Sequence, residues 1–210
     1  MYRITSLIAI VAIGSLTASA EIINLSTPST SMILDANVGQ PLKTLYYGER
    51  LSDKDIENLT SSPLVNHDAY PVYGIYPQGE AALSVTHSDG NRTTQAGITD
   101  VTTKEVNGAT VTTVAMRDYA YPFDIKVNYR VRPGYDVIET WVDLTNNEKG
   151  TVTLNRFMSG YLPIRYGDVW ISSLYGSWAN EANLTEEPLT HGVKMIKNKD
   201  GLILLLEYLG

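Results

Sequence analysis

The side chains most able to do chemistry in this 210-residue chain are carboxylates, because the sequence has no cysteine and only three histidines. Two carboxylates that flank a sugar can hydrolyse a glycosidic bond, one as the acid and the other as nucleophile or base. Asp68, Asp168, Glu181 and Glu186 offer such groups, but their spacing along the chain brings no pair together. We therefore expect solvated loop acids at these positions and assign no catalytic residue.

The sequence offers few residues that could form a metal site or act as a nucleophile. The lack of cysteine excludes a thiolate zinc site, a cysteine nucleophile and a disulfide scaffold. His67, His87 and His191 stand far apart in polar stretches, so we expect surface or loop histidines and no metal site. No nucleophile elbow, zinc-protease, phosphate-loop or dinucleotide motif occurs, and we predict no cofactor.

The aromatic residues are biased towards tyrosine, with 14 Tyr and 3 Trp against 2 Phe. A ring with a polar edge suits sugar rings and protein interfaces, and tyrosine is also a good strand residue, so composition alone leaves these interpretations open. Tyr175 and Trp178 flank Gly176, where the backbone can turn sharply and present a ring outward. We predict these two side chains as candidate substrate-binding residues, with a core or interdomain anchor as the alternative for Trp178.

Alternating apolar and polar residues dominate the chain after residue 20 and predict strands. Residues 123–131 place Ile125, Val127 and Tyr129 on one face, and a Pro-Gly turn leads to a returning strand over 137–144. A second hairpin joins 101–106 to 110–116 across Asn107-Gly108. Further strands are expected over 151–159 and in the shorter segments 31–34, 42–47, 81–87, 169–174 and 193–197, with one brief helix over 52–59.

Nine or ten short strands with turn signals between them predict an all-β fold, a large antiparallel β-sandwich of the supersandwich type. The sequence shows no repeat or linker that would divide it, so we expect one domain over 21–201.

Residues 1–20 have the three parts of a secretory signal peptide: Arg3, an apolar core, and Ala18-Ser19-Ala20 as the cleavage site. We therefore expect an exported protein, periplasmic or extracellular. A formal net charge of −7 gives no reason to expect nucleic acid or an anionic membrane as a partner.

Three stretches, taken in order, resemble a known family. They are TLYYGER at 44–50, AYPVYG at 69–74, and a longer stretch over 135–192 that contains YDVIETWVDLTNN, LNR, LYGSWANE and PLTHG. Together they are similar to the N-terminal β-sandwich domain of glycoside hydrolase family 36, whose best-known members are α-galactosidases (melibiases). The resemblance covers residues 40–201 approximately, and the order and spacing of the motifs carry it.

The resemblance implies a sandwich that precedes a (β/α)8 barrel and packs against it. In the family the barrel carries the two aspartates of a retaining mechanism that acts on galactoside-type carbohydrate. The sequence ends before any barrel, so no catalytic position can be carried over. The expected role is that of a non-catalytic domain that supports the barrel and oligomer contacts. Residues 202–210, LILLLEYLG, depart from the family, and we interpret this apolar tail as the end of a truncated gene product, with a docking strand as the alternative.

Two other functions fit the same residues. A freestanding carbohydrate-binding module would bind sugar through its exposed rings. A structural or adhesive sandwich would bind another protein without any dependence on sugar.

Overall fold

The structure is a computed structural model of the chain, and it describes residues 22–61, 67–74, 80–164, 168–177, 179–190 and 194–196. The expected signal peptide, Trp178, His191 and the apolar tail over 202–210 lie outside the described residues. The chain divides into two compact units, Met1–Pro163 and Ile164–Gly210, and each is described by itself.

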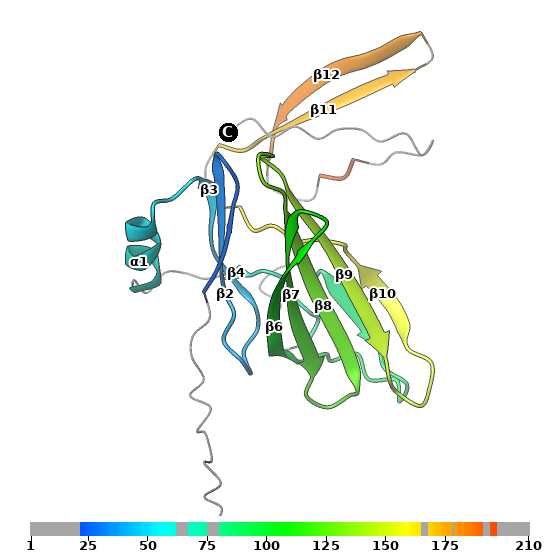
Figure 1. Ribbon diagram of the computed structural model, residues 1–210. Coiled ribbons are helices and arrows are strands. Elements are labelled where there is room, and N and C mark those ends of the chain that lie inside the picture. The colour runs from blue at the N-terminus through cyan, green and yellow to red at the C-terminus, as the bar shows by residue number, and fades with distance from the viewer. Residues whose placement is uncertain are drawn as a thin grey trace, which may run out of the picture. The chain divides into compact units, whose positions relative to one another are not determined.

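The first sheet of the larger unit has four antiparallel strands in chain order, β1-β2-β3-β4. Their bounds are Ile22–Ser26, Thr30–Asp35, Lys43–Glu49 and His67–Asp68. The helix α1 (Asp53–Ser61) follows β3 (Figure 1). The brief helix expected over 52–59 is thus confirmed, and Ser52 and Asp55 cap its first turn by exchanging side-chain to backbone hydrogen bonds. Among the described residues, no helix is long and apolar enough to cross a membrane.

The second sheet also has four antiparallel strands in chain order, and Figure 1 shows it as the green layer. The strands are β6 (Ala96–Val106), β7 (Ala109–Asp118), β8 (Phe123–Val131) and β9 (Ile138–Asn146). The predicted Asn-Gly turn joins β6 to β7, with φ of 52° at Asn107 and 72° at Gly108. Both residues tolerate the left-handed region that a tight hairpin turn requires.

The two four-stranded sheets share one hydrophobic core. The predicted inward face of β8 is confirmed, because Ile125, Val127 and Tyr129 are all buried there together with Leu34 of β2 and Val114 of β7. The all-β antiparallel prediction is thus confirmed. The alternation places Asn128 on the opposite, polar face of β8, but this side chain is buried as well. Its amide accepts a hydrogen bond from Thr113 and donates one to Asp143, which satisfies it.

A small two-stranded sheet completes the larger unit. In it β5 (Leu83–Thr86) pairs antiparallel with β10 (Thr153–Phe157), with a register shift between Leu154 and Arg156. β5 is buried for most of its length, whereas every residue of β10 is exposed.

The smaller unit contains a single described hairpin, in which β11 (Trp170–Ser177) pairs antiparallel with β12 (Asn180–Pro188). The prediction of a strand over 169–174 is confirmed, but β12 was not predicted. The strand expected over 193–197 was wrong for its described part, because residues 194–196 are not in a strand.

Candidate functional site

Tyr175, one of the two predicted sugar-binding residues, lies on β11 opposite Asn183 of β12 and is 57% exposed. The glycine beside it is required by the hairpin, because a Cβ at Gly176 would lie 2.8 Å from the Cα of Glu181. Tyr175 is therefore presented to solvent, as the sequence predicts. Its partner in the prediction, Trp178, lies outside the described residues, so its binding role stays a prediction.

The four carboxylates singled out from the sequence are surface groups. Asp168, Glu181 and Glu186 are exposed, and Glu186 accepts a hydrogen bond from Ser172 at 3.0 Å. Asp68 forms an ion pair with Lys43, its cross-strand neighbour on β3. The expectation of solvated loop acids holds for Asp168, whereas Asp68, Glu181 and Glu186 lie in strands, and Asp68 is half-buried in its ion pair.

Two carboxylates outside this set, Asp136 and Glu139, are held in the ionised form by their neighbours. Hydrogen bonds from Ser29 and Thr27 lower the pKa of Asp136, and hydrogen bonds from Arg130 and Arg132 lower the pKa of Glu139 below the ordinary carboxyl value. A glycosidase acid needs the opposite shift, because it must keep its proton at neutral pH. These groups are unsuited to that role.

The prediction of a surface histidine was wrong for His87, which is 2% exposed. Its Nδ1 lies 2.8 Å from Oε1 of Glu148, and its Nε2 lies 3.1 Å from the buried hydroxyl of Thr94. The imidazole stacks on the ring of Tyr121 with a centroid distance of 3.8 Å. Both ring nitrogens therefore have partners, which allows a histidine from a polar stretch to be buried.

Burial opposes the ionisation of Glu148, but hydrogen bonds from His87 and Ser88 outweigh it and lower the pKa of this carboxyl below its ordinary value. The pair is a buried, satisfied structural cluster. His67 on β4 is exposed, and no group of three metal-ligating side chains exists within the part of the chain that the structure describes.

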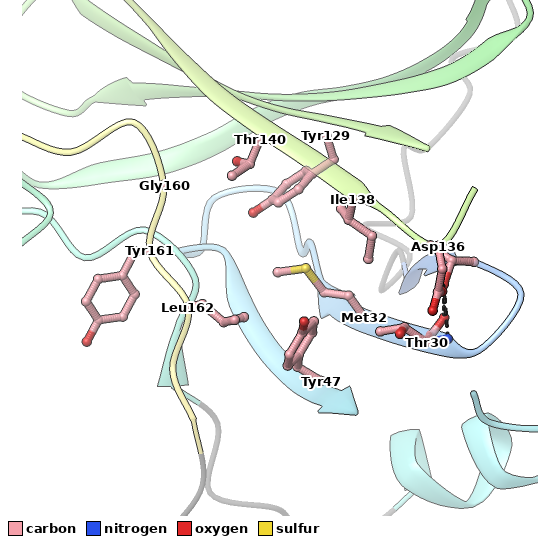
Figure 2. A pocket seen from close by; sticks show the side chains of 11 residues that line it. Thr30, Met32, Tyr47, Tyr129, Asp136, Ile138, Thr140, Gly160, Tyr161 and Leu162 are labelled. Atoms are coloured by element: carbon pink, nitrogen blue, oxygen red, sulfur yellow. Dashed lines mark hydrogen bonds between the residues drawn. The ribbon is translucent and has the colours of Figure 1, made fainter. Parts of the chain in front are cut away.

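The feature that sequence reasoning missed is a hollow of about 280 Å³ in the larger unit, shown in Figure 2. It lies among β2, β3, β8, β9 and residues 160–162. The hydroxyl of Tyr129 points into it from β8. The alternation of residues 123–131 placed Tyr129 correctly on the inward face, but no signal in the sequence showed that a hollow would form beside it.

Comparisons with known proteins fit this architecture. Residues 40–203 match the model of the glycosyl hydrolase family 36 N-terminal domain. Alpha-galactosidase C of Emericella nidulans is 27% identical over 97 residues, which are 46% of this chain and 13% of that protein.

Two solved structures show the same fold. The family 36 alpha-galactosidase AgaA from Geobacillus stearothermophilus has a TM-score of 0.72 at 17% identity, over 86% of this chain and 30% of that one. The alpha-galactosidase from Lactobacillus brevis has a TM-score of 0.68 at 21% identity, over 81% of this chain and 28% of that one. The chain therefore spans less than a third of the relatives it matches. Because the family model matches most of its length, this chain belongs to the glycosyl hydrolase family 36 N-terminal domain family.

Proposed function

We propose that this chain serves as the non-catalytic N-terminal sandwich of an exported α-galactosidase-like hydrolase that acts on galactoside-type carbohydrate. The observation that carries the proposal is the family match over residues 40–203. A related structure, a variant of AgaA, is described as a complex with raffinose, and this chain corresponds to 30% of it. The chemistry would then belong to a barrel domain in the remaining polypeptide.

The state of the carboxylates supports a non-catalytic role. Asp136, Glu139 and Glu148 have lowered pKa values, so each favours the carboxylate form and is a poor proton donor at neutral pH. Each also has its oxygens occupied by hydrogen bonds within the fold. These three groups fix structure, and none of them is an acid poised to protonate a leaving group.

The strand β10 gives the larger unit a surface that a barrel could cover. Among the described residues β10 pairs only with β5, with Leu154 opposite Val85 and Phe157 opposite Leu83. Both β5 residues are fully buried, whereas Leu154 and Phe157 are large, apolar and exposed. An unpaired edge with exposed apolar side chains is a liability unless another element covers it, and we assign that cover to the barrel.

Export is proposed on the composition of residues 1–20 alone. Fractionation of the producing cells tests it. Recovery of the chain in the periplasm or medium, with a new N-terminus at Glu21, is the expected result, and a chain confined to the cytoplasm with Met1 intact would contradict export.

The catalytic part of the proposal is tested by incubating the purified full chain with an aryl α-galactoside. We expect no turnover above the buffer blank. Turnover that survives further purification would overturn the non-catalytic role.

The barrel is tested separately by sequencing the DNA that follows the codon of Gly210. We expect it to encode a (β/α)8 barrel, in the same or another frame. A downstream region without barrel-coding sequence would remove the support for that partner.

We also propose that the domain supports oligomer contacts. Light scattering of the full-length product tests this, and a mass equal to that of one chain would contradict it.

A further inference from the structure

The hollow beside Tyr129 contains a hydroxyl group that the described fold does not use. Tyr129 as a whole is 3% exposed, and none of the described residues forms a hydrogen bond with its hydroxyl, yet this oxygen is not among the fully buried atoms that lack a partner. Figure 2 shows this hydroxyl directed into the space between Met32 and Thr140. The oxygen therefore faces the hollow, where it can donate and accept hydrogen bonds.

A second tyrosine in the same core, Tyr70, uses its hydroxyl in a hydrogen bond within the fold. The hydroxyl of Tyr70 donates to the carbonyl oxygen of Met158 at 2.8 Å. Burial raises the pKa of Tyr129, so its phenol keeps its proton at neutral pH and can both donate and accept. The hydroxyl is therefore available to a group that enters the hollow.

The lining of the hollow combines hydroxyls, aromatic rings and apolar surface. Thr30 and Thr140 add hydroxyl groups and Tyr47 adds an aromatic ring, whereas the ring of Tyr161 points away from the hollow in Figure 2. Met32, Ile138 and Leu162 supply the apolar part. A sugar ring presents both hydroxyl edges and apolar C–H faces, and so it matches this combination.

Charge and size narrow the ligand class further. The lining contains no lysine, arginine or histidine, and its one charged group is Asp136, which already accepts hydrogen bonds from Thr27 and Ser29. An anionic ligand would meet only this negative charge, and Asp136 is already engaged by Thr27 and Ser29, which leaves no free carboxylate for a cation, so an uncharged ligand fits the lining best. A volume of about 280 Å³ is at the lower end of the range for small-molecule sites, which fits one ring and not an oligosaccharide.

We propose that the hollow lined by Met32, Tyr47, Tyr129, Ile138, Thr140 and Tyr161 binds one pyranose ring of a neutral carbohydrate, with the Tyr129 hydroxyl bonded to a ring hydroxyl. This site is separate from the predicted Tyr175 and Trp178 pair. It rests on the chemistry of the lining, so it does not depend on the proposed α-galactosidase context.

The experiment is a titration of the full chain with D-galactose, D-glucose and raffinose. Binding is measured by isothermal titration calorimetry and by saturation-transfer NMR. We expect saturable binding of at least one of the two monosaccharides, with a dissociation constant in the millimolar range. Tyr129→Phe removes only the hydroxyl and should weaken binding about three- to tenfold. Thr140→Val, a second variant at an exposed position of the lining, should weaken it as well.

The thermal midpoint separates binding from a structural effect. Tyr129→Phe deletes a hydroxyl that has no partner among the described residues, so its Tm should stay about the same while its affinity falls. Tyr73→Phe is the matched control, because Tyr73 is exposed and outside the lining of the hollow, so the same chemical change there should leave the affinity unchanged. Absence of saturable sugar binding, or equal affinity of Tyr129→Phe and the unchanged chain, would overturn the proposal.

Discussion

Replacing Glu148 by alanine tests whether the buried histidine cluster holds the larger unit together. The Glu148 side chain is 3% exposed and that of His87 is 0% exposed. The carboxylate accepts three hydrogen bonds, from His87 Nδ1 at 2.8 Å, from the Ser88 amide at 2.9 Å and from the Ser88 hydroxyl at 2.6 Å. Alanine removes all three acceptor contacts at once.

The magnitude follows from what is left behind. The His87 ring stays packed against Tyr121 and Phe123, and its Nδ1 loses its partner. A hydrogen bond to a charged group contributes about 1.5–3 kcal/mol, and a buried polar group left without a partner costs about 1–3 kcal/mol. We expect Glu148→Ala to lower the free energy of unfolding by about 3–5 kcal/mol. Glu148→Gln keeps one acceptor and should lower it by about half as much.

Urea unfolding at neutral pH, followed by circular dichroism, measures these differences as a shift in the midpoint. Glu105→Ala is the matched control, because Glu105 is exposed and accepts a hydrogen bond only from Thr110 among the described residues. That change should stay within about 0.5 kcal/mol of the unchanged chain.

The same variants predict a pH dependence. The folded pKa of Glu148 lies below its ordinary value of 4.5, so the stability that the carboxylate provides is present above that pH and is lost as the pH falls through the folded pKa. The difference in stability between the unchanged chain and Glu148→Gln should therefore shrink as the pH is lowered below this value. A Glu148→Ala chain as stable as the control, or a difference that does not vary between neutral and acid pH, would refute the reasoning.

Three further changes are expected to lower stability in the same assay. Tyr70→Phe leaves the Met158 carbonyl oxygen without its donor and should cost about 1–2 kcal/mol, and an unchanged urea midpoint would contradict this. Gly74→Ala would place a Cβ 2.0 Å from the Thr94 carbonyl oxygen, so we expect a loss of about 3 kcal/mol or failure to fold, and a normal midpoint would show that the loop yields. Gly108→Ala forces a side chain into a φ of 72° and should cost about 1 kcal/mol, with Gly108→Asn less affected because asparagine tolerates this region; equal losses would contradict the turn argument.

Strand β8 could be predicted from the sequence residue by residue, whereas β1 was not predicted and β6 begins at Ala96, five residues before the predicted strand. β8 has the same bounds as the predicted strand, because Ile125 and Val127 alternate with polar residues and a shift of one residue would expose them. The Asn107-Gly108 turn was equally readable, since its two positive φ values exclude most other residue pairs. In both cases a short segment contains all the information that fixes its own structure.

β12 could not be predicted in this way. Its sequence, NEANLTEEP, has no apolar alternation, and most of its residues are exposed. It becomes a strand because β11 provides a partner, with Leu174 opposite Leu184 and Trp170 opposite Pro188. The information therefore lies in the pairing and not in the segment, so a strand propensity read along one segment misses it.

The same distinction explains why the buried polar groups were missed. Polar neighbours of His87 indicated a surface position, but Glu148, which satisfies it, is 61 residues away in the chain. The hollow is similar, because its lining joins Met32 and Tyr47 of the first sheet to Tyr129 and Thr140 of the second. An apolar side chain needs only an apolar side of a strand, whereas a buried polar group needs a particular partner, and that partner comes from a distant segment. Residue patterns thus locate the core of such a domain, while its polar interior, where a ligand would be recognised, is defined only when the sheets are packed together.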